Sequence, residues 1–333
     1  MTSAAGSPGD SRYGVGFLVV GSPRSGTTLV QRLACEIPGV GMPAETHFFS
    51  QFVTGLLERR SFPLEGPALT EEIGRFGSLD SARGLAVDAT GVVKALGGVC
   101  RSPFDLFDAL VRQLAGPAEI WGEKTPEHLL WWRPLSQCAP GLRFVVVVRD
   151  PRAVVASNLG MPWRDDGRIP AWGENVHLAF AEMWACVQDQ VRLMESELGG
   201  DRVLRLRYED VATDPDGARG RIARFLGRPP VTETVAAPEG IVLPWEPWKS
   251  AALGPVVTEN FDAWRRSLGD RRAHEVAAVC RGGMTRYGYG DDAPSALRAK
   301  VTLARLGPRQ LARTLRYRRA YRGYVTAIAG RRL

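Results

Sequence analysis

The sequence is poor in cysteine, in lysine and in long apolar runs, and each shortage excludes a class of protein. The cysteines are odd in number, far apart and never spaced C-x-x-C, which argues against a disulfide framework and a zinc site. Residues 1–14 lack a basic segment followed by an apolar one, and no apolar run is long enough to cross a bilayer. We therefore expect a protein of the reducing cytoplasm. The cysteines are Cys35, Cys100, Cys138, Cys186 and Cys280.

Basic residues are mostly arginine and are unevenly distributed. Only four of the 43 are lysine: Lys94, Lys124, Lys249 and Lys300. A lysine retained in such an arginine-rich chain indicates a position that needs a compact ammonium group. Residues 297–333 contain eleven basic and no acidic residues, so the preceding residues carry a net charge of −4, against +7 for the whole chain. A body of this charge is not built to coat nucleic acid, and we expect no nucleic-acid partner.

Three apolar segments predict buried strands that a turn and a helix follow. They are GFLVVG, with a helix starting near Thr27; the run 144–148, followed by a second helix; and 202–211, RVLRLRYEDV, followed by a helix ending in RFLG. Apolar residues at three- and four-residue spacing also predict a long helix over 176–191. Strands that alternate with helices predict a P-loop-type α/β fold with a parallel sheet and right-handed crossovers.

The 333 residues allow one large α/β domain or two small ones. We expect residues 1–296 to form the main domain. Within it, prolines and glycines break 51–119 into short helical pieces, which predicts a helical lid rather than sheet. Residues 297–333 are expected to form a basic helical tail.

The segment Gly21-Ser-Pro-Arg-Ser-Gly-Thr-Thr28 follows a predicted strand and opens a predicted helix. In that context backbone N–H groups and the helix dipole hold a phosphate. The spacing G-x-x-x-x-G is that of a phosphate-binding loop, but Thr27 stands where a nucleotide triphosphatase has lysine. A site that binds phosphate without a metal fits better, and sulfuryl transfer is such a reaction because the moving group carries less negative charge than a phosphoryl group.

Five motifs occur in the order seen in sulfotransferases that use 3′-phosphoadenosine 5′-phosphosulfate (PAPS). They are GSPRSGTT, PAETHFF, EKTPEHL, RDPRAVVAS and RYEDV. The chain most resembles the branch that includes bacterial, Golgi carbohydrate and tyrosylprotein enzymes. The resemblance implies a transferase with PAPS as co-substrate, an acceptor hydroxyl, in-line transfer and no metal.

The resemblance assigns donor ligands residue by residue. Arg24, Ser25, Gly26, Thr27 and Thr28 match the loop that holds the 5′-phosphosulfate. Arg149 and Ser157, eight residues apart, match the 3′-phosphate ligands, and Tyr208 matches a tyrosine near the nucleotide. Lys249 and Trp264 resemble the lysine-then-tryptophan segment of the tyrosylprotein branch, although their separation is longer here. Each has a structural alternative: Arg149 as a surface ion-pair residue, Ser157 as a small packing residue and Trp264 as core.

Glu45 matches the glutamate that takes the acceptor proton. A carboxylate near phosphates needs desolvation to become basic, and we expect Pro43, Phe48 and Phe49 to raise its pKa. His47 is the rival base, because imidazole needs no pKa shift; alternatively Glu45 caps a helix and His47 only packs. Lys124 matches the lysine at the bridging oxygen of the donor, with an ordinary ion pair to Glu123 or Glu127 as its alternative.

Other functions and the partners stay open at the level of sequence. A P-loop small-molecule kinase would need the missing lysine and magnesium, and a binding protein acting through the Arg-rich tail would leave the motif order unexplained. The acceptor is a small-molecule, carbohydrate, phenol, peptide tyrosine or lipid-linked hydroxyl. The tail is a solvated helix, or an arm that docks on the body or on a second subunit, as in a homodimer, or a segment that contacts an anionic membrane peripherally.

Overall fold

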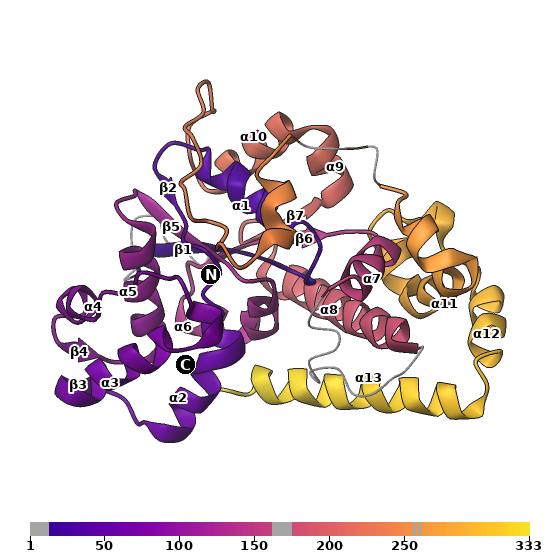
Figure 1. Cartoon of the computed structure of the whole chain (residues 1–333), viewed down its shortest axis with the longest axis horizontal. Helices are drawn as coiled ribbons and strands as arrows, with labels where there is room; N and C mark the ends of the chain where they lie inside the picture. Colours follow the sequence, from indigo (N-terminus) through magenta and orange to yellow (C-terminus); the bar gives the residue numbers. More distant parts are fainter. Residues whose placement is uncertain (1–12, 162–174, 256–257, 259–260) are drawn as a thin grey trace, which may run out of the picture.

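The computed structural model describes residues 13–161, 175–255, 258 and 261–333. Residues 1–12, for which the sequence predicts no signal segment, lie outside this part. The centre is a five-stranded sheet in the order β2-β5-β1-β6-β7, and every neighbouring pair is parallel (Figure 1). The predicted parallel α/β architecture is therefore confirmed. The strands are β1 (Val15–Gly21), β2 (Val40–Gly41), β5 (Ile120–Lys124), β6 (Arg143–Val148) and β7 (Val203–Arg207).

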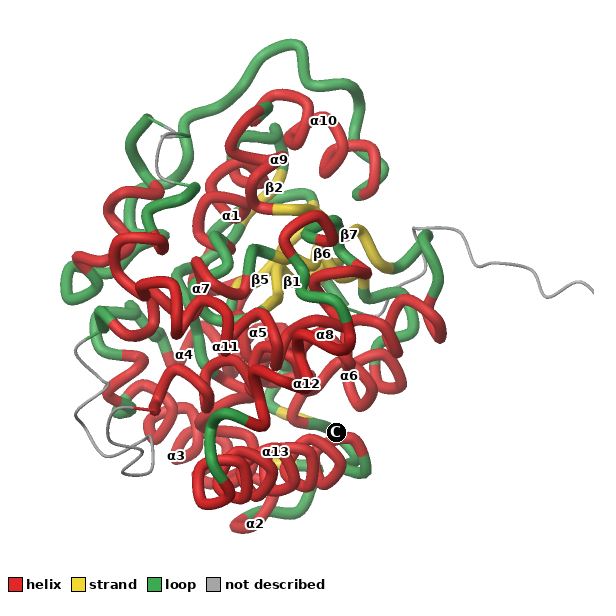
Figure 2. Tube along the Cα trace, turned by 90° about the vertical axis from the view of Figure 1, so that its right-hand side faces the viewer, coloured by secondary structure: helices red, strands yellow, loops and turns green. Residues whose placement is uncertain are grey.

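The sheet is buried on both faces because its strands are almost continuously apolar. Along β1, Phe17 and Val19 face one core, whereas Leu18 and Val20 face the other. The first core lies against α1 (Thr27–Cys35), α9 (Tyr208–Thr213) and α10 (Pro215–Phe225). The second, larger core lies against α5 (Pro103–Ala115), α6 (Trp132–Cys138), α8 (Val176–Leu198) and α11 (Trp264–Arg286) (Figures 1 and 2). Such two-sided burial is what parallel strands require.

The helices match the sequence-based prediction at most positions. The helices that flank the sheet are α1 (Thr27–Cys35), α5 (Pro103–Ala115), α6 (Trp132–Cys138), α7 (Pro151–Leu159), α8 (Val176–Leu198), α9 (Tyr208–Thr213), α10 (Pro215–Phe225) and α11 (Trp264–Arg286), with the 3₁₀ segments η3 (Pro126–Trp131), η6 (Pro247–Ala252) and η7 (Gly290–Asp292). One expectation was wrong. The strand predicted over 202–211 ends at Arg207, and Tyr208 begins α9, because the acidic Glu209 and Asp210 suit the first turn of a helix.

The lid predicted over 51–119 is largely helical. It contains α2 (Val53–Arg59), α3 (Gly66–Gly77), η2 (Asp80–Ala82), α4 (Ala89–Ala95) and α5, and it follows the single-turn π-helix η1 (Phe48–Phe52). The prediction that the lid contains no sheet was wrong in detail. Two short strands of two residues each, β3 (Leu64–Glu65) and β4 (Val99–Cys100), pair in antiparallel orientation. In Figure 1 this layer lies to one side of the central sheet.

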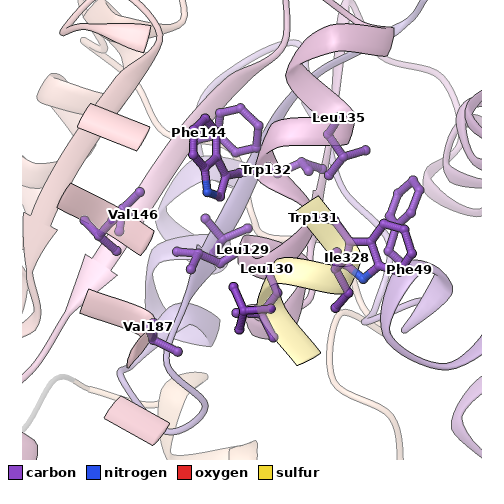
Figure 3. Packing of buried hydrophobic residues seen from close by; sticks show 14 of the residues in the cluster. Phe49, Leu129, Leu130, Trp131, Trp132, Leu135, Phe144, Val146, Val187 and Ile328 are labelled. Atoms are coloured by element: carbon purple, nitrogen blue, oxygen red, sulfur yellow. The ribbon is translucent and has the colours of Figure 1, made fainter. Parts of the chain in front are cut away.

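The basic tail forms α12 (Ala296–Ala304) and the long helix α13 (Pro308–Ala329). α13 runs beside α8 and also contacts α6 and η3. Figure 3 shows its Ile328 among the core side chains, near Trp131 and Phe49. Arg318 donates two hydrogen bonds, of 2.5 and 2.7 Å, to the buried carboxylate of Glu182 on α8. Within the described ranges, no helix is both long and apolar enough to cross a membrane.

Candidate active site

The predicted site residues gather at the carboxyl edge of the sheet. The phosphate-binding loop follows β1, Lys124 ends β5, Arg149 follows β6 and Tyr208 follows β7. Glu45 lies four residues after β2. The carboxyl ends of parallel strands are where open α/β sheets bind ligands, and all five strands contribute here.

The loop after β1 is shaped for an anion. Gly26 has φ 90° and Arg24 has φ 71°, both in the left-handed region, and a side chain at Gly26 would place its Cβ 2.2 Å from the Tyr208 ring. Gly26 is also the N-cap of α1 and offers no side-chain cap, so the first N–H groups of the helix remain for a ligand. The buried Ser22 hydroxyl has no hydrogen-bond partner in the described part of the chain. These donors fit a phosphate group.

The structure joins this loop to the predicted second anion site. Arg24 Nε donates to Ser157 Oγ at 3.1 Å, and Arg149 donates to the Arg24 carbonyl at 3.3 Å. The Arg149 guanidinium lies over the Tyr208 ring, 4.2 Å from its centroid. Burial, followed by the nearby charge of Arg149, lowers the pKa of Arg24. Two adjacent guanidinium groups in a partly buried loop create a field that favours a multiply charged anion.

Glu45 is the centre of a buried charge cluster. Its carboxylate contacts Lys124, lies 2.7 Å from Lys249 Nζ and lies 3.1 Å from His47 Nε2. Lys124 is 0% exposed and also donates to Thr28 Oγ1 at 3.2 Å, which ties the cluster to the first turn of α1. The alternatives raised by the sequence are wrong at these positions: Lys124 pairs with Glu45 and not with Glu123 or Glu127, and Glu45 does not cap a helix.

The expectation that burial raises the pKa of Glu45 above its ordinary value is wrong. Burial is the largest influence and raises the pKa, but Lys124, Lys249 and His47 outweigh it and hold the pKa well below its ordinary value. Burial likewise lowers the pKa of His47, but contact with Glu45 raises it overall, so the ring is protonated more readily than a free histidine. Burial lowers the pKa of Lys124 and is only partly offset by Glu45. Burial also lowers the pKa of Lys249, but Glu45 and Glu246 outweigh it and raise the pKa overall.

Lys249 reaches the cluster from the segment 241–254, which crosses the phosphate-binding loop. Lys249 also contacts the buried carboxylate of Glu246, and the Trp248 carbonyl accepts from Arg24 at 3.5 Å. On the other side, Trp245 Nε1 donates to the Arg83 carbonyl of the lid at 2.7 Å. The segment 241–254 therefore links the lid to the phosphate-binding loop. Sequence reasoning missed Glu246, whose only signal was its i, i+3 spacing from a rare lysine.

Trp264 does not join the other predicted ligands. It begins α11 and is buried in the larger core, where the guanidinium of Arg152 lies 4.2 Å from its ring centroid. The alternative that Trp264 is a core residue therefore agrees with its position. Phe261 instead packs against Tyr208, with ring centroids 6.2 Å apart, and sequence reasoning had assigned it no role.

The carboxylate that follows β6 is already engaged. Asp150 accepts from the Arg152 backbone N–H at 2.8 Å and from its guanidinium at 2.6 Å, so it caps α7. Among the described residues, no three His, Cys, Asp or Glu side chains gather as a metal site. The site thus offers an anion-binding loop, four cationic side chains (Arg24, Arg149, Lys124 and Lys249) and one central carboxylate.

Comparison with known proteins agrees with this arrangement. The model of the sulfotransferase family matches residues 17–233. Carbohydrate sulfotransferase 3 of Tetronarce californica is 28% identical over 158 residues, which are 44% of this chain and 36% of that protein. The aligned region therefore spans about a third of that relative's length.

Two solved structures are similar at low identity. The sulfotransferase domain of the curacin biosynthetic pathway is 21% identical, with a TM-score of 0.45 over 66% of this chain and 76% of that domain. The sulfotransferase domain of the Synechococcus PCC 7002 olefin synthase is 18% identical, with a TM-score of 0.47 over 75% and 86%. Since the family model alone covers more than half of its residues, the chain belongs to the sulfotransferase family.

Proposed function

We propose that this protein transfers a sulfuryl group from PAPS to an acceptor hydroxyl, without a metal. The observation that carries the proposal is the buried contact of Glu45 with Lys124 beside Thr28, at the start of α1. This contact places a carboxylate that can take a proton next to an ammonium that can neutralise a leaving phosphate. The adjacent loop supplies the N–H groups that a phosphosulfate needs.

In the proposed reaction, Glu45 takes the proton of the acceptor hydroxyl. The acceptor oxygen forms a bond to sulfur, and the bond from sulfur to the 5′-phosphate oxygen breaks. The electron pair leaves with that phosphate, and adenosine 3′,5′-bisphosphate is the second product. Lys124 neutralises the charge that develops on the bridging oxygen, and the N–H groups of the loop stabilise the remaining phosphate oxygens.

The low pKa of Glu45 without donor is compatible with its role as the base. An anionic donor attracts the same two ammonium groups that now contact Glu45. Each contact that shifts from the carboxylate to the donor raises the pKa of Glu45 toward its ordinary value. The carboxylate therefore gains basicity when the donor is bound. His47 is the weaker candidate for the base, because its contact with Glu45 raises its pKa and so favours the protonated ring.

The acceptor belongs to the carbohydrates, phenols, peptide tyrosines or lipid-linked alcohols. The experiment is to incubate the protein with PAPS labelled at sulfur and an extract of the source cells, and to identify the labelled product. Transfer of the label to a hydroxyl supports the proposal. Absence of labelled product, together with no retention of the protein on immobilised adenosine 3′,5′-bisphosphate, contradicts it.

A P-loop kinase is the competing enzyme class, and chelation separates the two. The sulfuryl group needs less charge neutralisation than a phosphoryl group, and Asp150 is committed to capping α7. Labelled transfer is therefore expected to proceed at an unchanged rate in excess EDTA. Strict magnesium dependence after add-back would favour the kinase.

We also propose that the basic tail contacts an anionic membrane peripherally. Most of the apolar side chains of α12 and α13 pack on the body, yet Leu297 (72% exposed), Val301, Leu315 and Tyr324 face solvent. Exposed arginines surround them, at Arg298, Arg305, Arg309, Arg313, Arg316 and Arg319. Cations interleaved with exposed leucine and tyrosine suit an anionic headgroup region.

Sedimentation with vesicles tests the membrane contact. Binding is expected to vesicles that contain phosphatidylserine and not to pure phosphatidylcholine, and it should weaken in high salt. Replacing Arg309, Arg313 and Arg316 by glutamine should abolish binding while donor affinity is retained. Equal binding by that variant, or self-association through this surface on gel filtration, would contradict the proposal and leave the predicted homodimer as the explanation.

A further inference from the structure

The loop that carries Glu45 is held mainly by side chains from the end of β5 and from the segment that follows it. Four consecutive backbone N–H groups, those of residues 46–49, each donate to a side chain. Their acceptors are Glu123 for Thr46 (3.0 Å), Thr125 for His47 (3.2 Å), Thr46 itself for Phe48 (3.3 Å) and His128 for Phe49 (3.1 Å). A loop whose amides are all bound by side chains depends on those side chains for its conformation.

Glu123 is the centre of this network and is fully buried. One carboxylate oxygen accepts from the Thr46 amide, the Thr46 hydroxyl at 2.9 Å and the Thr125 hydroxyl at 2.7 Å. The other oxygen lies 2.9 Å from His128 Nδ1. A buried carboxylate satisfied at both oxygens holds its partners in one arrangement, because losing any partner leaves a charge poorly solvated.

The tautomer of His128 follows from its two contacts. Nε2 accepts from the Phe49 amide, so the proton is on Nδ1, where it is donated to Glu123. The ring is enclosed edge-on by Phe49 and Phe107, with centroids 5.1 and 6.0 Å away. His128 therefore connects Glu123 to the far end of the loop as a neutral hydrogen-bonding group.

We propose that Glu123, Thr125 and His128 are positioning residues that fix the Glu45 carboxylate against the Lys124 ammonium. This inference rests on the proposed function. Glu123 precedes Lys124 directly at the end of β5, so one strand end sets the place of both the lysine and the base loop. His47, two residues after Glu45, has a φ of 51°, and the network maintains this strained conformation.

Hydroxyl deletion at Thr125 tests the proposal without removing a buried charge. Thr125→Val keeps the shape but leaves the His47 amide without its acceptor, whereas Thr125→Ser keeps the hydroxyl. The readout is release of labelled sulfate from PAPS with water as acceptor, and affinity for adenosine 3′,5′-bisphosphate measured separately. We expect kcat of Thr125→Val to fall about 10²-fold, as for a small misplacement of a catalytic group, with product affinity unchanged. Thr125→Ser should stay near the wild-type rate.

Two further variants separate positioning from general destabilisation. Val191→Ala opens a cavity in the core beside α8, and it should lower the melting temperature while leaving kcat intact. Thr46→Val and Thr46→Ser repeat the comparison on the loop itself, should Thr125→Val not fold. Normal kcat in both valine variants, or loss of product affinity in parallel with kcat, would overturn the inference. Absence of sulfate release by the wild-type protein, together with no affinity for adenosine 3′,5′-bisphosphate, would instead overturn the proposed function.

Discussion

Replacing Glu45 by glutamine separates catalysis from binding more sharply than any other single change. The amide keeps the size of the side chain and much of its hydrogen bonding but removes the basicity. Loss of a general base lowers turnover on the order of 10²–10⁴-fold, which is about 2.7–5.4 kcal/mol of transition-state stabilisation. Donor affinity should be retained or should increase, because Lys124 and Lys249 no longer share their charge with the Glu45 carboxylate.

The same substitution should destabilise the protein without donor. It leaves the buried Lys124 ammonium without its carboxylate partner, whereas Lys249 keeps Glu246, and removing one partner of a buried ion pair typically costs about 3–5 kcal/mol. Adenosine 3′,5′-bisphosphate at about 100 times its dissociation constant should restore about 2.7 kcal/mol by linkage. Thermal unfolding with and without this ligand measures both effects, and at one fixed ligand concentration the rescue should be larger for the variant than for the wild type if its affinity has increased.

The pH dependence provides an independent check. Because the pKa of Glu45 is lowered in the folded protein, the carboxylate stays charged down through the ordinary glutamate range. The acidic limb of kcat/KM is then expected below the ordinary glutamate range, and the stability that Glu45 contributes is lost only as pH falls through its lowered pKa. Near-normal turnover of Glu45→Gln, combined with an inactive His47→Ala, would refute the reasoning and make the histidine the base.

Three other predictions follow from contacts in the structure. Arg149→Ala should weaken binding of adenosine 3′,5′-bisphosphate by about 1.5–3 kcal/mol in a calorimetric titration, and unchanged affinity would remove Arg149 from the donor site. Lys249→Gln removes a cation 2.7 Å from Glu45, so the pKa of the carboxylate should rise and the acidic limb of kcat/KM should move to higher pH. Arg318→Ala should lower the free energy of unfolding by about 3 kcal/mol, since it leaves the buried Glu182 without its partner, whereas exposed Arg316→Ala should change little.

The parts of the fold that sequence could predict are those whose signal is local. β1 and β6 are apolar runs that end in a turn motif, so both the strand and its ligand residues were predicted together. β5 was not predicted, because Gly122 interrupts the segment and two charged residues end it. Its glycine is explained only by the fold: a Cβ at Gly122 would lie 2.3 Å from the Phe17 ring on the neighbouring strand.

The candidate site shows the same division. The resemblance of the motifs to those of PAPS-dependent sulfotransferases indicated Arg24, Arg149 and Lys124, which lie at or directly after strand ends. The sign of the pKa shift of Glu45 did not follow, because it depends on Lys249, about 200 residues away in the chain. The prediction that Trp264 contacts the cofactor gained no support for a related reason. The motif indicated a ligand, but the ring at the start of α11 is buried in the core.

The position of Lys249 has a consequence for where this protein can be divided. The family match ends at residue 233, whereas the lysine beside Glu45 and the carbonyl that accepts from Arg24 come from the segment 241–254. A fragment trimmed at the recognised boundary would keep the phosphate-binding loop but would present Glu45 with one ammonium instead of two. Expression of an active minimal enzyme therefore has to extend at least through this segment, and sequence variation there can alter the chemistry while the recognisable motifs stay intact.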